Sequence, residues 1–198
     1  MRINRIELEN FRTYAKNVIE LDPSNNIAIF NFLNGTGKTS LLNAISWCLH
    51  GEEIYPRERG PAGGYALREA AHTGSEITTS VSLEVTFDDG TDATIARTAT
   101  YIPVDASGNS AQKTNEFLRV TSKPAGEQSF ATVEDPEYWV FARLPQSLSG
   151  HYLFDGQNLS KFFNPNSSGG IRTSVLQIAR VDALERTIKH LEKVIDSL

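Results

Sequence analysis

The chain has 198 residues, of which 39% are hydrophobic and 22% are charged, a composition typical of a soluble globular domain with its own core. The net charge of −5 excludes a strongly basic nucleic-acid-binding protein, so any contact with DNA would need a local patch, another segment or a partner. The single cysteine, Cys48, excludes a disulfide within the chain. The sequence shows neither a signal peptide nor a run of 18 apolar residues, which favours a cytoplasmic protein with no membrane partner.

The amino-terminal part is predicted to form three strands. Residues 2–9 alternate between apolar and charged side chains, and a second short strand is expected at residues 18–21. Turn-forming residues occupy 22–26. The apolar run at 27–30 predicts a third, buried strand.

A glycine-rich stretch follows this third strand and precedes an apolar-rich helix predicted from about Thr39 to His50, with Gly51 as its cap. Strand, glycine turn and helix is the context of a phosphate-binding loop, in which backbone N–H groups and the positive end of the helix face the anion. Lys38 is expected to reach the β- and γ-phosphates, and the Thr39 hydroxyl to bind Mg²⁺. The predicted loop residues are Asn34, Gly35, Thr36, Gly37, Lys38, Thr39 and Ser40.

Phe32 departs from the full phosphate-loop pattern, which has a glycine five residues before Gly37. A bulky side chain there is expected to weaken nucleotide binding without abolishing it. Two alternatives remain open at this point. The stretch could be a glycine-rich turn with an incidental lysine, or the chain could be an interaction module that no longer binds nucleotide.

Residues 51–65 are rich in glycine, proline and charge and are predicted to form a solvated loop, before a short helix at 65–71. From Val81 to Phe87 the apolar residues alternate with polar ones, then Asp88-Asp89-Gly90-Thr91 predicts a tight turn and a returning strand at 92–101. Asp88 and Asp89 are therefore not read as a Walker B pair, because a central parallel strand would be apolar almost throughout.

Further along, strands are expected at 116–121 and 128–133, so that residues 76–133 form an antiparallel sheet beside the nucleotide-binding half. Asp135-Pro136-Glu137 is predicted to open a helix through Leu144, since proline is tolerated in the first turn.

Two segments carry a resemblance to a known family. Ile6-x-Leu8-x-Asn10-Phe11-Arg12, followed by a short hairpin and then by residues 34–51, resembles the amino-terminal end of SMC-type ATPases. That group includes double-strand-break-repair head ATPases, RecF and the DNA sulfur modification ATPase DndD. The resemblance implies that Arg12 contacts the bound nucleotide. The alternative is that Arg12 is a surface residue beside a turn.

The stretch Phe154-Asp155-Gly156-Gln157 resembles the Q-loop region of this family and, in its first three residues, the Phe-Asp-Gly-Glu motif of DndD-like ATPases. The resemblance implies that Asp155 faces Mg²⁺ or the γ-phosphate and is catalytic together with Lys38, with Gln157 as a second nucleotide contact. The alternative is a strand-to-helix turn that needs Asp and Gly only for its geometry.

The chain ends on a helix-like pattern whose apolar positions step by four and three residues: Leu184, Ile188, Leu191, Ile195 and Leu198. Two heptads fit either a coiled coil or an ordinary amphipathic helix, and the resemblance favours the root of a coiled coil. Because signature, Walker B and switch-histidine motifs were not found, the resemblance implies that they lie in a carboxy-terminal lobe. The expected organisation is an amino-terminal head lobe at 1–170 and a coiled-coil root at 171–198.

The expected fold is α/β: a P-loop NTPase head lobe of the ABC/SMC type, with a mixed sheet, an antiparallel side sheet and a terminal helix. The expected function is binding of ATP and Mg²⁺ in a DNA-associated ATPase closest to DndD, serving DNA sulfur modification, phage defence or repair. The expected partners are the carboxy-terminal lobe, a second head forming a homodimer on ATP binding, and DNA through the complete complex. This chain alone is expected to hydrolyse little ATP. Besides the interaction module, a compact P-loop kinase or transferase is a weaker alternative.

Overall fold

The fold is described from a computed structural model of the chain. It describes residues 1–25, 27–33, 35–55, 76–103 and 111–146, with Ser149 and Leu153. The chain divides into two compact units, Met1–Arg143 and Leu144–Leu198. In the second unit, the Leu153 N–H donates a hydrogen bond of 2.8 Å to the Ser149 carbonyl oxygen. The architecture below concerns the first unit.

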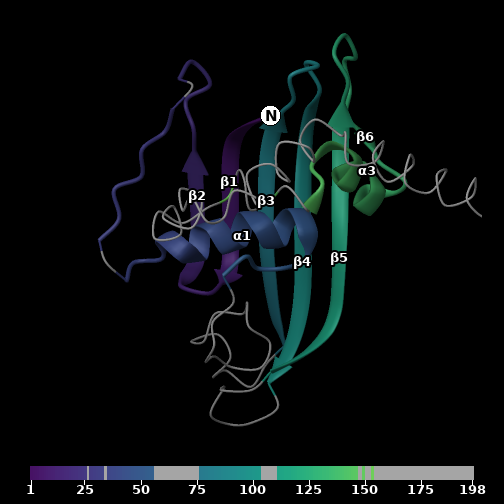
Figure 1. The fold of residues 1–198 in the computed structure, drawn as a ribbon. Coiled ribbons are helices and arrows are strands. Elements are labelled where there is room, and N and C mark those ends of the chain that lie inside the picture. Colours follow the sequence, from purple (N-terminus) through teal and green to yellow (C-terminus); the bar gives the residue numbers. More distant parts are fainter. Residues whose placement is uncertain are drawn as a thin grey trace, which may run out of the picture. The chain divides into compact units, whose positions relative to one another are not determined.

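The first unit is built on a six-stranded sheet in which every pair of neighbours is antiparallel (Figure 1). Its order is β2-β1-β3-β4-β5-β6. The strands are β1 (Arg2–Phe11), β2 (Tyr14–Glu20), β3 (Ile77–Thr86), β4 (Asp92–Pro103), β5 (Ala111–Lys123) and β6 (Ala131–Thr132).

Period-two alternation gives the sheet one apolar face. Along β3, buried residues alternate with more exposed ones from Ile77 to Thr86. Opposite them, Val81 pairs with Arg97 and Leu83 with Ile95 on β4. Because successive side chains of a strand point to opposite faces, this register collects the buried positions of β3 and β4 on the same side of the sheet.

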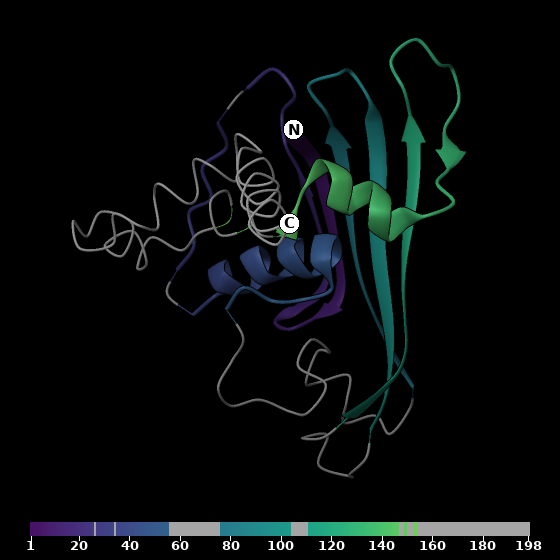
Figure 2. The same cartoon turned by 45° about the vertical axis from the view of Figure 1, so that its right-hand side comes forward.

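Helix α1 (Lys38–His50) covers this apolar face, where it packs against β1, β3 and β4 (Figures 1 and 2). Most of its length from Ser40 to Leu49 is buried, and the rings of Phe11 and Trp47 lie 5.5 Å apart. The helix ends at Gly51, whose φ of 73° is left-handed and whose N–H donates to the Trp47 carbonyl at 2.8 Å.

A second described helix, α3 (Pro136–Arg143), packs against α1 and β5 (Figure 2). Asp135 starts it, since its side chain accepts a hydrogen bond from the Tyr138 N–H at 3.0 Å. Val140 is its buried residue. Neither described helix is long and apolar enough to cross a membrane.

The structure confirms several sequence predictions and corrects others. The strand at residues 2–9, the helix ending at Gly51, the hairpin turn at Asp88 and Asp89, and the helix from Pro136 are all present. The predicted side sheet, however, is continuous with β1 and β2, so the described sheet is a single antiparallel one and no mixed sheet is seen within the described ranges. The predicted helices at 65–71 and 171–198 lie outside the described residues.

The predicted strand at 27–30 is wrong for this structure. Residues 27–33 have no regular secondary structure, and no strand of the described residues pairs with them. Their apolar side chains are exposed instead of buried: Ile27 by 78%, Ile29 by 89% and Leu33 by 80%. An apolar run forms a buried strand only where neighbouring strands satisfy its backbone groups, and the described strands do not do so for residues 27–33.

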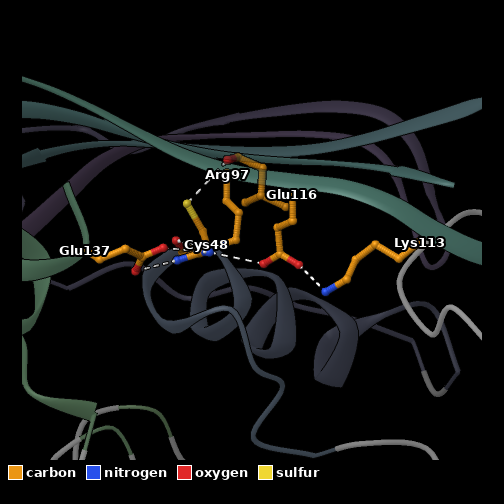
Figure 3. Close-up of polar contacts among 6 residues, drawn as sticks. Cys48, Arg97, Lys113, Glu116 and Glu137 are labelled. Atoms are coloured by element: carbon orange, nitrogen blue, oxygen red, sulfur yellow. Dashed lines mark hydrogen bonds and ion pairs between the residues drawn. The ribbon is translucent and has the colours of Figure 1, made fainter. Parts of the chain in front are cut away.

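One buried arginine joins four elements at the carboxyl end of α1 (Figure 3). Arg97, on β4, is 4% exposed, and its Nε donates to the Cys48 carbonyl of α1 at 3.2 Å. Its Nη1 forms ion pairs of 3.1 Å with Glu116 of β5 and with Glu137 of α3. Lys113 in turn pairs with Glu116 at 2.5 Å. The cation therefore lies where the helix dipole favours positive charge, and it ties α1 and α3 to the sheet.

Cys48 lies beside this cluster, fully buried between α1 and the sheet. Its Sγ is 3.3 Å from the carbonyl oxygens of both Val81 and Ile95, and its single S–H donates to one of them at a time. Burial raises the pKa of the Cys48 thiol to about 12, although Arg97 acts in the opposite direction. The thiol is therefore a packing group.

We expect Arg97→Ala to lower the free energy of unfolding by about 3 kcal/mol, because it leaves the Cys48 carbonyl without this donor and Glu116, which is partly buried, with only Lys113 as its cation among the described residues. Urea unfolding followed by circular dichroism measures this loss. Arg119→Ala, which removes an exposed arginine from β5, is the matched control and should change stability by less than about 0.5 kcal/mol. Equal effects of the two substitutions would contradict the role given to Arg97.

Cys48 should not react with a water-soluble disulfide reagent at about pH 8 while the protein is folded, because it is buried and remains protonated. In guanidinium chloride the same thiol should react fully. The release of the coloured thiol product measures both rates. Rapid reaction of the folded protein would show that α1 does not protect this site.

Candidate phosphate-binding site

The candidate site begins in the glycine-rich loop between residues 27–33 and α1. Gly35 and Gly37 have φ values of 81° and 110°, in the left-handed region that favours glycine. The Thr36 N–H and the Thr36 hydroxyl both donate to the Leu33 carbonyl, at 3.3 and 2.8 Å. These bonds and the two glycines turn the chain sharply into the first residue of α1.

The amino terminus of α1 is suited to an anion. Gly37 is its N-cap and provides no side-chain cap, and the first turn contains no acidic residue. The helix instead starts with Lys38, which is exposed. A lysine near the positive end of the helix dipole is unfavourable by itself, whereas a bound phosphate would accept bonds from both the lysine and the helix N–H groups. The residues present therefore fit a phosphate group.

The turn between β1 and β2 packs directly on this loop. The Tyr14 hydroxyl donates to the Gly37 carbonyl at 3.0 Å, and burial raises the pKa of Tyr14. A Cβ atom at Gly37 would lie only 2.8 Å from the Thr13 Oγ1 and 3.0 Å from the Tyr14 hydroxyl oxygen. The chain is unusual here, because Arg12 in the turn and Asn10 near the end of β1 have left-handed φ values of 54° and 49°. Close packing thus fixes the turn against the loop.

Arg12, within this turn, is not a surface residue. Its side chain is 6% exposed and forms an ion pair with Glu53, whose side chain is 4% exposed. The Arg12 Nε donates to Glu53 Oε1 at 2.6 Å, and Nη2 donates to Oε2. The alternative that Arg12 is a surface residue is therefore wrong. The predicted solvated loop at 51–65 is also wrong at one position, because the Glu53 side chain is buried. Sequence reasoning missed Glu53 because nothing near it in the chain marks it as the partner of Arg12.

Two buried polar residues of α1 hold the segment that carries Glu53. Asn43 donates to the Tyr55 carbonyl at 2.8 Å and accepts from the Tyr55 N–H at 2.9 Å. The Ser46 hydroxyl donates to the Glu52 carbonyl at 2.8 Å. Asn43 and Ser46 are 2% and 3% exposed. These hydrogen bonds satisfy the two polar side chains and so explain how the buried side of α1 can carry them.

The structure brings together most of the predicted site residues in the first unit. Gly35 to Ser40 form one loop and helix start, and the turn that carries Arg12 contacts it. Phe32 is half-buried with its ring 6.0 Å from that of Phe30, and the left-handed glycines follow it all the same. Asn34, Asp155 and Gln157 lie outside the described residues, so their roles remain predictions.

The described residues do not by themselves form a complete set of ligands for Mg²⁺. Within the described ranges, no group of three or more His, Cys, Asp or Glu residues could hold a metal ion. Of the predicted ligands, Thr39 is described and half-buried in the first turn of α1. A hydroxyl at this position is the kind of single protein ligand that Mg²⁺ takes when substrate phosphates and water supply the others.

Comparison with known proteins decides the family. A family model described as an AAA domain matches residues 5–198. The chain belongs to this AAA_23 family. Over 51 residues, which are 26% of the chain, it is 43% identical to the DNA double-strand break repair Rad50 ATPase of Halobacterium salinarum. The aligned stretch is only 6% of that relative, so the chain spans a small part of it.

A solved structure from work on ATP-driven dimerization and DNA-stimulated activation of SMC ATPases is also similar. It matches with a TM-score of 0.49 and 16% identity, over 88% of this chain and 99% of that chain. This likeness is too low to support an argument by itself. The family match places the chain among AAA domain proteins, and a 51-residue stretch of it is similar to a Rad50 ATPase. The resemblance to DndD stays a prediction.

We expect Gly37→Ala to destabilise the nucleotide-free protein by about 2 to 3 kcal/mol, since it combines a left-handed φ with a collision against Thr13 and Tyr14. Gly35→Ala is the matched control, because φ there is 81° and a Cβ would meet nothing within 4 Å. It should cost about 1 kcal/mol, from backbone strain alone. Thermal unfolding of both variants measures the difference, and equal losses would show that the turn does not press on Gly37.

Proposed function

We propose that the chain is the ATP-binding amino-terminal lobe of an SMC/Rad50-like ATPase head that acts on DNA as part of a larger protein. The observation that carries this proposal is the start of α1, where left-handed glycines, an uncapped helix end and the exposed Lys38 converge. Membership of the AAA_23 family and the similarity to a Rad50 ATPase support it.

The proposed roles follow from the chemistry of each group. Lys38 neutralises charge on the β- and γ-phosphates, and the backbone N–H groups from Asn34 to Ser40 surround their oxygens. Arg12 is a further nucleotide contact. The Thr39 hydroxyl and Asp155 would hold Mg²⁺, which would supply positive charge against the phosphates, and Gln157 would be a second polar contact. Hydrolysis then rests on positioning and electrostatic stabilisation.

The exposed apolar run at residues 27–33 supports the proposal that a carboxy-terminal lobe completes this head. Its sequence has the composition of a buried strand, yet Ile29 is 89% exposed in this chain. We infer that strands of this carboxy-terminal lobe pair with the run and bury it, as its apolar character predicts. That lobe would also bring the catalytic carboxylate, and two such heads would close on ATP as a homodimer.

The sequence motifs alone support a proposal about the cellular process in which the protein acts. Phe154-Asp155-Gly156 favours a DndD-like protein in DNA sulfur modification or phage defence, whereas the sequence similarity found is to a repair ATPase. The second candidate function is a non-hydrolysing interaction module. Phe32, in the place of the usual glycine, is the feature that favours it.

Calorimetric titration with Mg-ATP tests the proposed function. The wild-type chain should bind, and Lys38→Ala should weaken the affinity at least about tenfold because a charge facing the phosphates is lost. Lys16→Ala, which removes an exposed lysine of β2, is the control and should bind as the wild type does. Turnover by this chain alone should be low.

Two results would contradict the proposal. If Mg-ATP gives no heat with the wild type and does not protect it from thermal unfolding, the interaction module is the better description. If the chain alone turns over ATP rapidly and Lys38→Ala abolishes that activity, the need for a second lobe is wrong.

A further inference from the structure

The ion pair between Arg12 and Glu53 differs from other ion pairs of the same hairpin. Both of its side chains are almost fully buried, with 6% and 4% exposure. By contrast, Arg5 on β1 pairs with Glu20 at 3.8 Å, and these side chains are 34% and 80% exposed. An exposed pair is loosely held, whereas a buried pair with two parallel hydrogen bonds fixes the plane of the guanidinium.

Glu53 uses only one edge of the Arg12 guanidinium. It accepts hydrogen bonds from Nε and from Nη2. A guanidinium carries five N–H donors, so both donors of Nη1 and one of Nη2 are not used by this carboxylate. Arg12 can therefore stay bonded to Glu53 and still donate to an anion, with its direction set by the carboxylate.

The segments that carry Arg12 and Glu53 both contact the helix α1. On one side, the turn that contains Arg12 contacts Gly37, the N-cap of α1, through Tyr14. On the other side, Asn43 and Ser46 of α1 bond the backbone on either side of Glu53. The contacts thus form a closed ring from the phosphate loop through α1 to Glu53, then to Arg12 and back to the loop.

We propose that Glu53 is a positioning residue for nucleotide binding, which holds the Arg12 guanidinium in a fixed orientation beside the phosphate loop. This inference rests on the function proposed above. Glu53 does not touch the nucleotide and acts through Arg12. Among the described residues, Glu53 is the carboxylate that forms an ion pair with Arg12. Loss of Glu53 therefore leaves the Arg12 guanidinium without a fixed orientation.

A double-mutant cycle on the complete protein tests this, with Mg-ATP affinity and steady-state KM and kcat as readouts. Arg12→Ala and Glu53→Ala should each weaken Mg-ATP binding about tenfold, and the double variant should be no weaker than Arg12→Ala alone. Glu53→Gln keeps the volume and one acceptor oxygen, so it should fold and lose about threefold in affinity. Each loss should appear in KM more than in kcat.

The control is Glu20→Ala, which removes the carboxylate of an exposed pair from the same hairpin and should leave binding unchanged. If the losses from Arg12→Ala and Glu53→Ala multiply in the double variant, Glu53 acts independently of Arg12 and the inference is wrong. If Lys38→Ala weakens binding but Glu53→Ala and Glu53→Gln do not, the proposed function stands and only this inference fails. If the wild type binds no Mg-ATP, both fail.

Discussion

The burial of α1 against the apolar face of the antiparallel sheet is the contact on which the rest of this structure depends. It places Trp47, Cys48 and Leu49 in the core, and it fixes the direction in which the helix begins. Since the proposed phosphate loop is the start of this helix, the packing of the core also orders the loop. The site is thereby built on a rigid element, as binding sites that must hold a small anion require.

Two arginines with buried side chains, Arg97 and Arg12, link the helix α1 to other elements of the first unit. At the carboxyl end, Arg97 bonds the last turn of the helix and joins it to β5 and α3 (Figure 3). Elsewhere on the helix, Arg12 and Glu53 connect the β1–β2 turn, which contacts the N-cap Gly37, to the segment that follows the helix. In both places a charge is buried only together with its partners, which limits the geometries the chain can adopt there.

Much of this arrangement could be predicted from the sequence where local pattern is sufficient. Period-two alternation gave β3 and β4, the glycine pattern located the loop, and Gly51 marked the end of α1. The prediction of a strand at 27–30 is wrong because burial of a strand depends on neighbouring strands, which the local sequence pattern does not specify. Glu53 was missed because its pairing with Arg12 joins residues 41 positions apart. Arg97 did carry a signal, since it occupies an inward-facing position of β4 among Ile95 and Ala99.

The exposure of residues 27–33 also affects how the isolated chain behaves in solution. Ile27, Ile29 and Leu33 place apolar surface next to a backbone segment without ladder hydrogen bonds in the described structure. Surfaces of this kind favour edge-to-edge association between copies, which grows with protein concentration. Purification at low concentration is therefore the condition under which a monodisperse sample is expected.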